Sequence, residues 1–261
     1  MPPERLQLLL PFPHAPGYDA RDFVPAASNE DALAWLEADW PDRRLALWGP
    51  AGCGKSHLLH IWAERNGARI LTGQTLTDQT LTDQTLSDLA GMPRNAALAL
   101  DDADTVHPEP PLLHLLNTAR DRGLHVLLSG RTAPSRWPIR LPDLSSRLRA
   151  ITAVEIHPPG DDLLTVLLMH LLADRQLNVA PPVQDWLLTH LPRSPSVLRQ
   201  AVARLDRISL TFGKPITRAL AARILVDDGF AAADSEDASI AEANEVSMSE
   251  GAPSSQPPGF L

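Results

Sequence analysis

Cysteine is nearly absent from this 261-residue chain, and long apolar runs are absent altogether. The single cysteine, Cys53, excludes a disulfide framework and a cysteine-rich metal site. The nine histidines show no metal-binding spacing, so we expect no structural metal. No apolar run approaches the ~18–20 residues of a membrane span, and the apolar start at residues 6–12 is too short for a signal peptide. These features predict a reduced, cytoplasmic protein without a membrane segment.

Basic residues are missing from the end of the chain. The net charge is −9, yet residues 227–261 hold eight acids and no base, whereas residues 1–226 hold 23 bases and 24 acids. The body is therefore close to neutral, and the acidity belongs to the tail. Because this polar composition cannot bury enough apolar surface to offset the entropy of ordering, we expect residues 228–261 to be disordered.

Short apolar runs alternate with helical patterns in the first part of the chain. Strands are predicted at 45–48, 69–71, 96–100 and 125–128, and helices from Ser28 to Pro41 and over 55–66 and 111–122. This alternation favours a parallel sheet with crossover helices. From Asp161 onward only helical patterns remain, over 161–174, 183–190, 196–210 and 217–226. We predict an extended segment (1–25), an α/β domain (26–158), a helical domain (159–227) and the tail.

One internal repeat interrupts this pattern: residues 74–88 read QTLTD, QTLTD and QTLSD. A five-residue period sends the leucines around a helix axis, and along a strand they alternate between faces. Neither arrangement builds an apolar stripe. We interpret the repeat as a tandem expansion on the surface.

A glycine-rich loop follows the first predicted strand. Its residues Gly49-Pro50-Ala51-Gly52-Cys53-Gly54-Lys55-Ser56 fit G-x-x-x-x-G-K-S without a gap and open a predicted helix. The glycines let backbone N–H groups turn toward phosphates, and the helix N-terminus adds partial positive charge. Lys55 suits the β and γ phosphates and Ser56 suits Mg²⁺. Cys53 stands at a variable position and is interpreted as a small filler.

Two carboxylates, Asp101 and Asp102, end a strand of Ala and Leu. The carboxyl ends of parallel strands border the crevice in which α/β proteins bind ligands. Asp101 is predicted to orient magnesium, directly or through water, and Asp102 to polarise a water molecule.

At this point three segments carry a resemblance to a known family. GPAGCGKSHLLH, LALDDAD and LLSGRTAPSRWPIRLPDLSSRLRA resemble the DnaA-related AAA+ family, most closely its Hda-type regulatory inactivators. The resemblance covers about residues 5–226. It implies a P-loop AAA+ core with a five-stranded parallel sheet, a C-terminal helical lid, and ADP or ATP with Mg²⁺ as cofactors. It also implies a pocket for the nucleotide base at Phe23, Val24 and Asn29.

The same resemblance implies a role in trans for Arg147 in DLSSRL, at the place of the family's arginine finger. Such a guanidinium stabilises transition-state charge on the phosphates of a neighbouring subunit, which in Hda-like proteins is ATP-bound DnaA. From the residues alone, the simpler interpretation is that Arg147 caps a helix or forms an ion pair with Asp143 one turn earlier.

Two departures from the family concern its nucleotide sensors. Gly130 stands where the initiator usually carries an acid, which leaves Ser129 as the polar sensor on that strand. Ser196 aligns with the nucleotide-sensing arginine of the lid, and Arg193 and Arg199, one turn away on either side, are candidates to replace it. Both departures predict a site that binds nucleotide but has weak or no hydrolysis of its own.

The N-terminal residues Gln7, Leu8, Leu10, Pro11 and Phe12 fit the Q-L-x-L-P-[L/F] peptide by which such proteins bind the DNA sliding clamp. Gln7 can form amide hydrogen bonds, Leu10 and Phe12 can fill an apolar pocket, and Pro11 lowers the entropy cost of binding. The alternative is a strand or staple that packs onto the chain's own domain. No recognition helix follows residue 226, so sequence-specific DNA binding is not expected.

The leading hypothesis is a negative regulator of replication initiation with the sliding clamp and DnaA as partners; self-association is also allowed. Two alternatives remain open. A self-sufficient AAA+ ATPase of the helicase-loader or initiator type would show intrinsic turnover and a basic, aromatic-lined channel for single-stranded DNA. A small-molecule P-loop kinase would need an acceptor pocket and lid arginines beside the phosphates.

Overall fold

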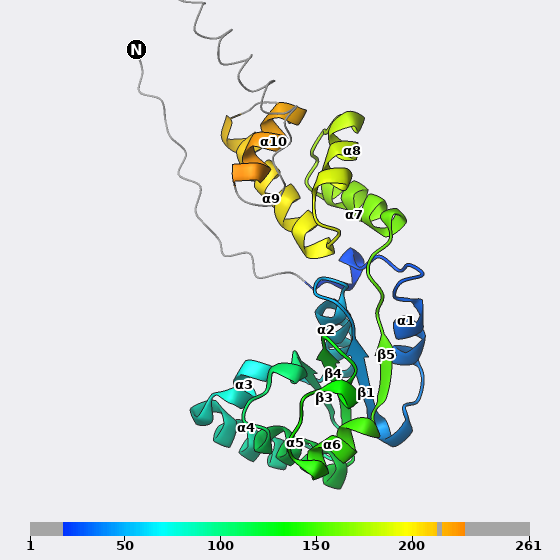
Figure 1. Ribbon diagram of the computed structural model, residues 1–261, viewed down its shortest axis with the longest axis vertical. Coiled ribbons are helices and arrows are strands. Elements are labelled where there is room, and N and C mark those ends of the chain that lie inside the picture. Colours follow the sequence, from blue (N-terminus) through cyan, green and yellow to red (C-terminus); the bar gives the residue numbers. More distant parts are fainter. Residues whose placement is uncertain (1–17, 213–215, 228–261) are drawn as a thin grey trace, which may run out of the picture.

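The computed structural model describes residues 18–212 and 216–227, so the predicted clamp peptide and acidic tail lie outside the described residues. Five parallel strands form one sheet in the order β2-β3-β4-β1-β5 (Figure 1). The strands are β1 (Arg44–Trp48), β2 (Arg69–Thr72), β3 (Ala97–Asp101), β4 (His125–Gly130) and β5 (Thr152–Glu155). The four strands expected from apolar runs are confirmed.

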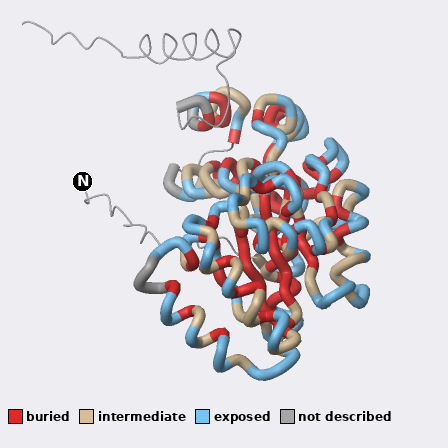
Figure 2. The backbone as a smooth tube through the Cα atoms, turned by 60° about the horizontal axis from the view of Figure 1, so that its bottom comes forward, coloured by how far each residue is buried: buried red, intermediate tan, exposed pale blue. Residues whose placement is uncertain are grey.

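Helices cover both faces of the sheet because its central strands are apolar on both sides. In β1, Leu45 and Leu47 pack with α1 and α2, whereas Ala46 joins the core under the helices of the opposite face. Figure 2 shows the strands as a buried centre between helices that are exposed on their outer sides. The helices are α1 (Glu30–Glu37), α2 (Lys55–Asn66), α3 (Gly73–Thr77), α4 (Gln79–Gly91), α5 (Pro110–Arg122) and α6 (Pro142–Arg149).

The remaining helices form a separate bundle, called the lid below. They are α7 (Asp161–Asp174), α8 (Pro181–His190), α9 (Pro195–Phe212) and α10 (Arg218–Asp227). Figure 1 places the bundle beyond the end of the sheet where β1 leads into α2. It has its own core, in which paired leucines of α7 recur every turn. In the described residues, no helix is both long and apolar enough to span a membrane.

The QTLTD repeat lies at the surface, with Gln74, Asp83 and Gln84 exposed, but one of its faces is buried. It forms α3 and α4, whose Leu76 and Leu89 are fully buried in the core beside α5. The helix breaks at Asp78, which has an extended backbone, and this break resets the helical phase. Thr82, Thr85, Leu86 and Leu89 then share one face, and the buried Thr82 hydroxyl donates to the backbone carbonyl of Asp78 at 2.7 Å. The expectation that the repeat builds no apolar stripe was wrong, because it took the repeat as one continuous helix or strand and counted only leucines.

The first helix also differs from the expectation. It begins at Glu30, with Asn29 rather than Ser28 as the N-cap, and ends at Glu37 rather than Pro41. Trp40 lies beyond its end, where the indole N–H donates to the carbonyl of Trp35 at 2.6 Å.

Candidate functional site

The loop Gly49–Ser56 connects the end of β1 to the start of α2. Gly52 and Gly54 have φ angles of 77° and 105°, which side chains with a Cβ rarely adopt. The loop therefore turns directly before the N-terminus of α2. A turn of this kind at a helix N-terminus is suited to binding phosphate. Cys53 is buried, and this burial raises the pKa of its thiol, which agrees with its interpretation as a filler.

Lys55 lies inside this loop. Its side chain is almost completely buried, and its ammonium donates to the carbonyls of Gly49 at 2.9 Å and Pro50 at 2.8 Å. A buried ammonium needs such partners, and phosphate oxygens are stronger acceptors than carbonyls. The lysine is therefore already placed where a nucleotide phosphate can take over its hydrogen bonds.

A hydrogen-bonded group joins the ends of three elements beside the loop. Ser56 Oγ of α2 donates to Asp101 Oδ1 of β3 at 3.1 Å, and Ser129 Oγ of β4 donates to the same oxygen. The backbone N–H of Asp102 donates to Ser129 Oγ at 2.9 Å. A hydroxyl and a carboxylate at one point fit Mg²⁺, which completes its shell with phosphates and water. The structure thus brings together Ser56, Asp101 and Ser129.

Asp102 differs from Asp101 in both backbone and environment. Its φ is 50°, a left-handed conformation, and its side chain is exposed. The pKa of its carboxyl is raised, mainly by partial burial and then by the negative charges of Asp101 and Asp104. Asp102 therefore differs from the buried Asp101 in exposure, and its predicted role in polarising a water molecule stays a prediction.

Gly130, which the resemblance places where the initiator carries an acid, has little free space around it. A Cβ on Gly130 would lie 2.9 Å from the Trp137 ring and 3.4 Å from the carboxyl carbon of Asp104. Asp104 was not expected at the site. One of its oxygens accepts from the N–H of Arg131 at 2.8 Å, and the other, Oδ1, is buried without a hydrogen-bond partner. A carboxylate from the loop after β3 thus lies beside the position where the acid is missing.

The predicted base pocket is an extended segment that crosses between the sheet and the lid. Phe23 approaches Gly54 and packs edge-on against His57 at a centroid distance of 5.3 Å. Val24 instead packs against the lid core. Asn29 is buried, donates to the Val24 carbonyl at 3.1 Å and accepts from the Ala26 N–H at 3.0 Å. Asn29 therefore fixes the shape of this segment.

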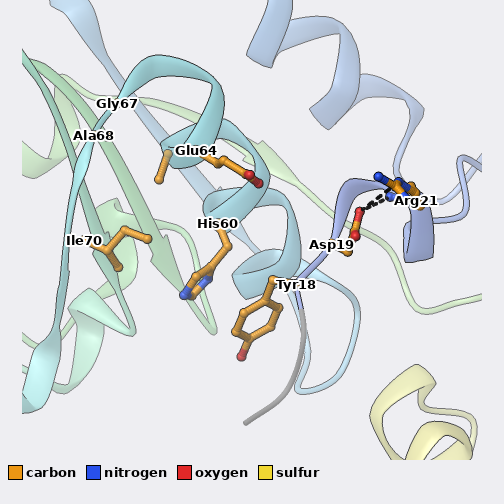
Figure 3. A pocket seen from close by; sticks show the side chains of 9 residues that line it. Tyr18, Asp19, Arg21, His60, Glu64, Gly67, Ala68 and Ile70 are labelled. Atoms are coloured by element: carbon orange, nitrogen blue, oxygen red, sulfur yellow. Dashed lines mark hydrogen bonds and ion pairs between the residues drawn. The ribbon is translucent and has the colours of Figure 1, made fainter.

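An aromatic cluster that the sequence did not predict borders the same region. The ring of Tyr18 stacks on His60 at 3.9 Å, and both line an open pocket of about 770 Å³ beside α2 and β2 (Figure 3). Burial and the charges of Asp101 and Asp102 raise the pKa of Tyr18. His57 Nε2 is 2.8 Å from the Asp19 carbonyl, and burial lowers the pKa of this imidazole. His57 and His60 therefore hold the chain entering the site.

The lid contacts the P-loop through hydroxyl groups. A Cβ on Gly52 would lie 2.2 Å from Ser194 Oγ and 3.4 Å from Ser196 Oγ, and these two hydroxyls are 2.8 Å apart. Arg193 points elsewhere and pairs with Asp161 at 3.0 Å, with two thirds of its side chain exposed. Arg199 donates to the backbone carbonyl of Asp22 at 2.9 Å.

Arg147 lies on α6, where it pairs with Asp143 at 3.5 Å and has a side chain 17% exposed. This is the ion pair that the residues alone suggested. Its Nε is buried without a hydrogen-bond partner. Its role as an arginine finger stays a prediction.

Comparison with known proteins identifies the fold. Domain III of the Thermotoga maritima replication initiation protein DnaA superposes with a TM-score of 0.67 at 21% identity, covering 81% of this chain and 97% of that one. AMPPCP-bound DnaA from Aquifex aeolicus gives 0.58 at 17% identity, covering 76% and 68%. A point mutant of Thermotoga maritima RuvB gives 0.59 at 16% identity, covering 78% and 70%.

In sequence, an uncharacterized protein of Haemophilus influenzae is 25% identical over 200 residues, which are 75% of this chain and 87% of that protein. No family model matches the chain. The chain has the AAA+ fold of DnaA and RuvB, a parallel α/β core followed by a helical lid. The predicted fold class is confirmed.

Proposed function

We propose that this chain binds ADP or ATP with Mg²⁺ at Gly49–Ser56 and acts as a regulator of replication initiation. The observation that carries the proposal is the convergence of Ser56, Asp101 and Ser129 beside the buried Lys55. These groups supply a hydroxyl, a carboxylate and a cation, which a magnesium nucleotide requires. The similar DnaA structures, one of them bound to AMPPCP, support an adenine nucleotide.

In this proposal the chain acts mainly on another protein. Trp137 occupies the space beside Gly130, and the lid presents Ser194 and Ser196 rather than an arginine to the P-loop. A site with these replacements holds nucleotide but stabilises the transition state of its own hydrolysis poorly. We infer that Gln7–Phe12 docks on the sliding clamp and that Arg147 enters the nucleotide site of ATP-bound DnaA, so that hydrolysis there lowers initiation.

The test measures hydrolysis of DnaA-bound ATP with the sliding clamp loaded on DNA. The wild-type chain accelerates hydrolysis. With Arg147→Ala the rate of hydrolysis on DnaA is lower by on the order of 10³-fold, as expected for a trans-acting arginine. Arg149→Ala, two residues along the same helix and exposed, is the matched control and retains it. Equal acceleration by wild type and Arg147→Ala overturns the finger assignment.

A second measurement isolates the clamp peptide. Replacing Gln7 and Leu10 together by alanine abolishes clamp binding and leaves ADP binding unchanged, because the proposal assigns these residues to the clamp and not to the nucleotide. Unchanged clamp binding contradicts the peptide assignment.

A self-sufficient ATPase is the second candidate, and the exposed Asp102 beside Asp101 favours it because this carboxylate can orient a water molecule. This candidate is supported if the chain alone hydrolyses ATP steadily and the Asp102→Asn variant does not. Such a result favours it over a regulator that promotes hydrolysis on DnaA.

A further inference from the structure

The segment around Phe23 is held from two sides. Phe23 packs with the core between the sheet and α1–α2, whereas its neighbours Val24 and Ala26 pack against the lid core. Successive side chains of an extended segment point in opposite directions, so this segment joins the two cores directly. Any movement of the lid changes the surroundings of Phe23.

Arg199 provides the polar contact between the lid and this segment. It lies on α9, is half-buried, and donates to the carbonyl of Asp22, 177 residues earlier in the chain. Burial lowers the pKa of the guanidinium, while the charge of Asp22 opposes this effect. The contact fixes the backbone immediately before Phe23.

The part of the lid that adjoins the P-loop carries neutral groups instead of a cation. Ser194 and Ser196 adjoin Gly52 with neutral hydroxyls, and the guanidinium of Arg193 is engaged with Asp161. Among the described residues, neither Arg193 nor Arg199 hydrogen-bonds to Gly49–Ser56. The lid therefore brings one half-buried cation, Arg199, to the segment that carries Phe23.

We propose that Arg199 is a positioning residue through which the lid responds to the base of the nucleotide and not to its γ-phosphate. The proposal rests on adenine nucleotide binding at Gly49–Ser56. Because a neutral pair of hydroxyls distinguishes a third phosphate weakly, ADP and ATP bind with affinities within a few-fold of each other. Because Arg199 shapes the segment that carries Phe23, it contributes to the preference for adenine over guanine.

The experiment measures the dissociation constants of ADP, ATP and GDP for the full chain by calorimetry. Arg199→Ala weakens ADP and ATP by the same factor, about tenfold for one lost hydrogen bond from a charged group, and reduces the ADP-over-GDP preference. Arg199→Lys restores part of the affinity for both because an ammonium can donate to the same carbonyl. Arg207→Ala, an exposed arginine on the same helix, leaves all three constants unchanged.

A selective loss of ATP affinity in Arg199→Ala overturns the inference, because it identifies a γ-phosphate sensor. Unchanged affinities or an unchanged base preference overturn it as well. If Arg199→Ala does not fold, Arg199→Lys carries the test: a smaller, equal loss for ADP and ATP supports the inference, and an ATP-selective loss contradicts it. A wild-type chain that binds neither ADP nor ATP contradicts the proposed function itself.

Discussion

The phosphate side and the base side of the site are built from the chain in different ways. The phosphate side is one continuous loop, Gly49–Ser56, completed by residues at the ends of two adjacent strands. The base side consists of a short segment held by α2 and by the distant α9. The first follows from local sequence and strand order, whereas the second exists only after the lid has packed. In the proposed function we expect the phosphate side to supply most of the affinity, because it holds the charged groups Lys55 and Asp101, and the base side to couple binding to the lid.

The largest effect is expected on the phosphate side, at Lys55. Lys55→Ala removes the cation that the loop encloses, whose hydrogen bonds to the Gly49 and Pro50 carbonyls pass to phosphate in the proposed complex. We expect it to weaken ADP and ATP binding by about a hundredfold or more, because charge-assisted hydrogen bonds to phosphate are lost. Calorimetric titration measures the loss. Binding of ATP at near wild-type affinity by a folded Lys55→Ala protein would place the nucleotide elsewhere.

The carboxylate Asp101 gives the next effect. Asp101→Asn keeps an acceptor for Ser56 and Ser129 but removes the charge that suits Mg²⁺. We expect ATP to bind about tenfold more weakly in the presence of Mg²⁺, as for one lost interaction of a charged group. With the metal removed by a chelator, wild type and variant bind alike. A loss that persists in the chelator refutes the magnesium role.

A smaller effect concerns stability on the phosphate side. Gly130→Ala places a Cβ 2.9 Å from Trp137 and lowers the free energy of unfolding by about 1–3 kcal/mol, as overpacking does. Denaturant unfolding measures the change. Gly91→Ala, at the end of α4, is the control because its Cβ meets nothing within 4 Å and its φ is not positive. We expect no loss of stability there, since Ala is favoured over Gly in a helix. Similar losses in both variants argue against a filled space beside Gly130.

The smallest effect is the pH dependence on the base side. Burial lowers the pKa of His57 in the folded chain, so the folded state binds a proton less readily than the unfolded state. The stability that the neutral imidazole provides is complete above the ordinary histidine pKa and declines as the pH falls from there toward the lowered pKa. Unfolding from pH 8 to 5.5 tests this: the stability advantage over His57→Asn shrinks with falling pH. A constant or growing advantage contradicts it.

The elements that local patterns specify could be predicted. The apolar runs at 45–48 and 125–128 form central strands because parallel strands covered on both faces need no polar alternation. The loop Gly49–Ser56 could be recognised as a phosphate-binding motif because its residues are contiguous. Asp101 could be recognised as a candidate magnesium residue because it ends a strand. These features depend on residues near one another in the chain or on the rule that parallel strands end at one edge.

The contacts between distant segments could not be predicted. Nothing in the sequence around Arg199 indicates that its partner is the carbonyl of Asp22, since any residue can provide a backbone acceptor. The approach of Ser194 to Gly52 depends on how the lid packs. The repeat was misread for a related reason: the break at Asp78 reorients the second helix, and threonines fill buried positions.

A double-mutant cycle on ATP binding tests most directly whether the two sides contribute separately. Asp101→Asn and Arg199→Ala alter groups on opposite sides without a shared hydrogen-bond partner. If the sides act independently, their losses multiply, so two losses of about tenfold combine to about a hundredfold in the double variant. The account is contradicted if the double variant binds ATP with the same affinity as the single variant that has the larger loss. That result would show that both residues serve one interaction.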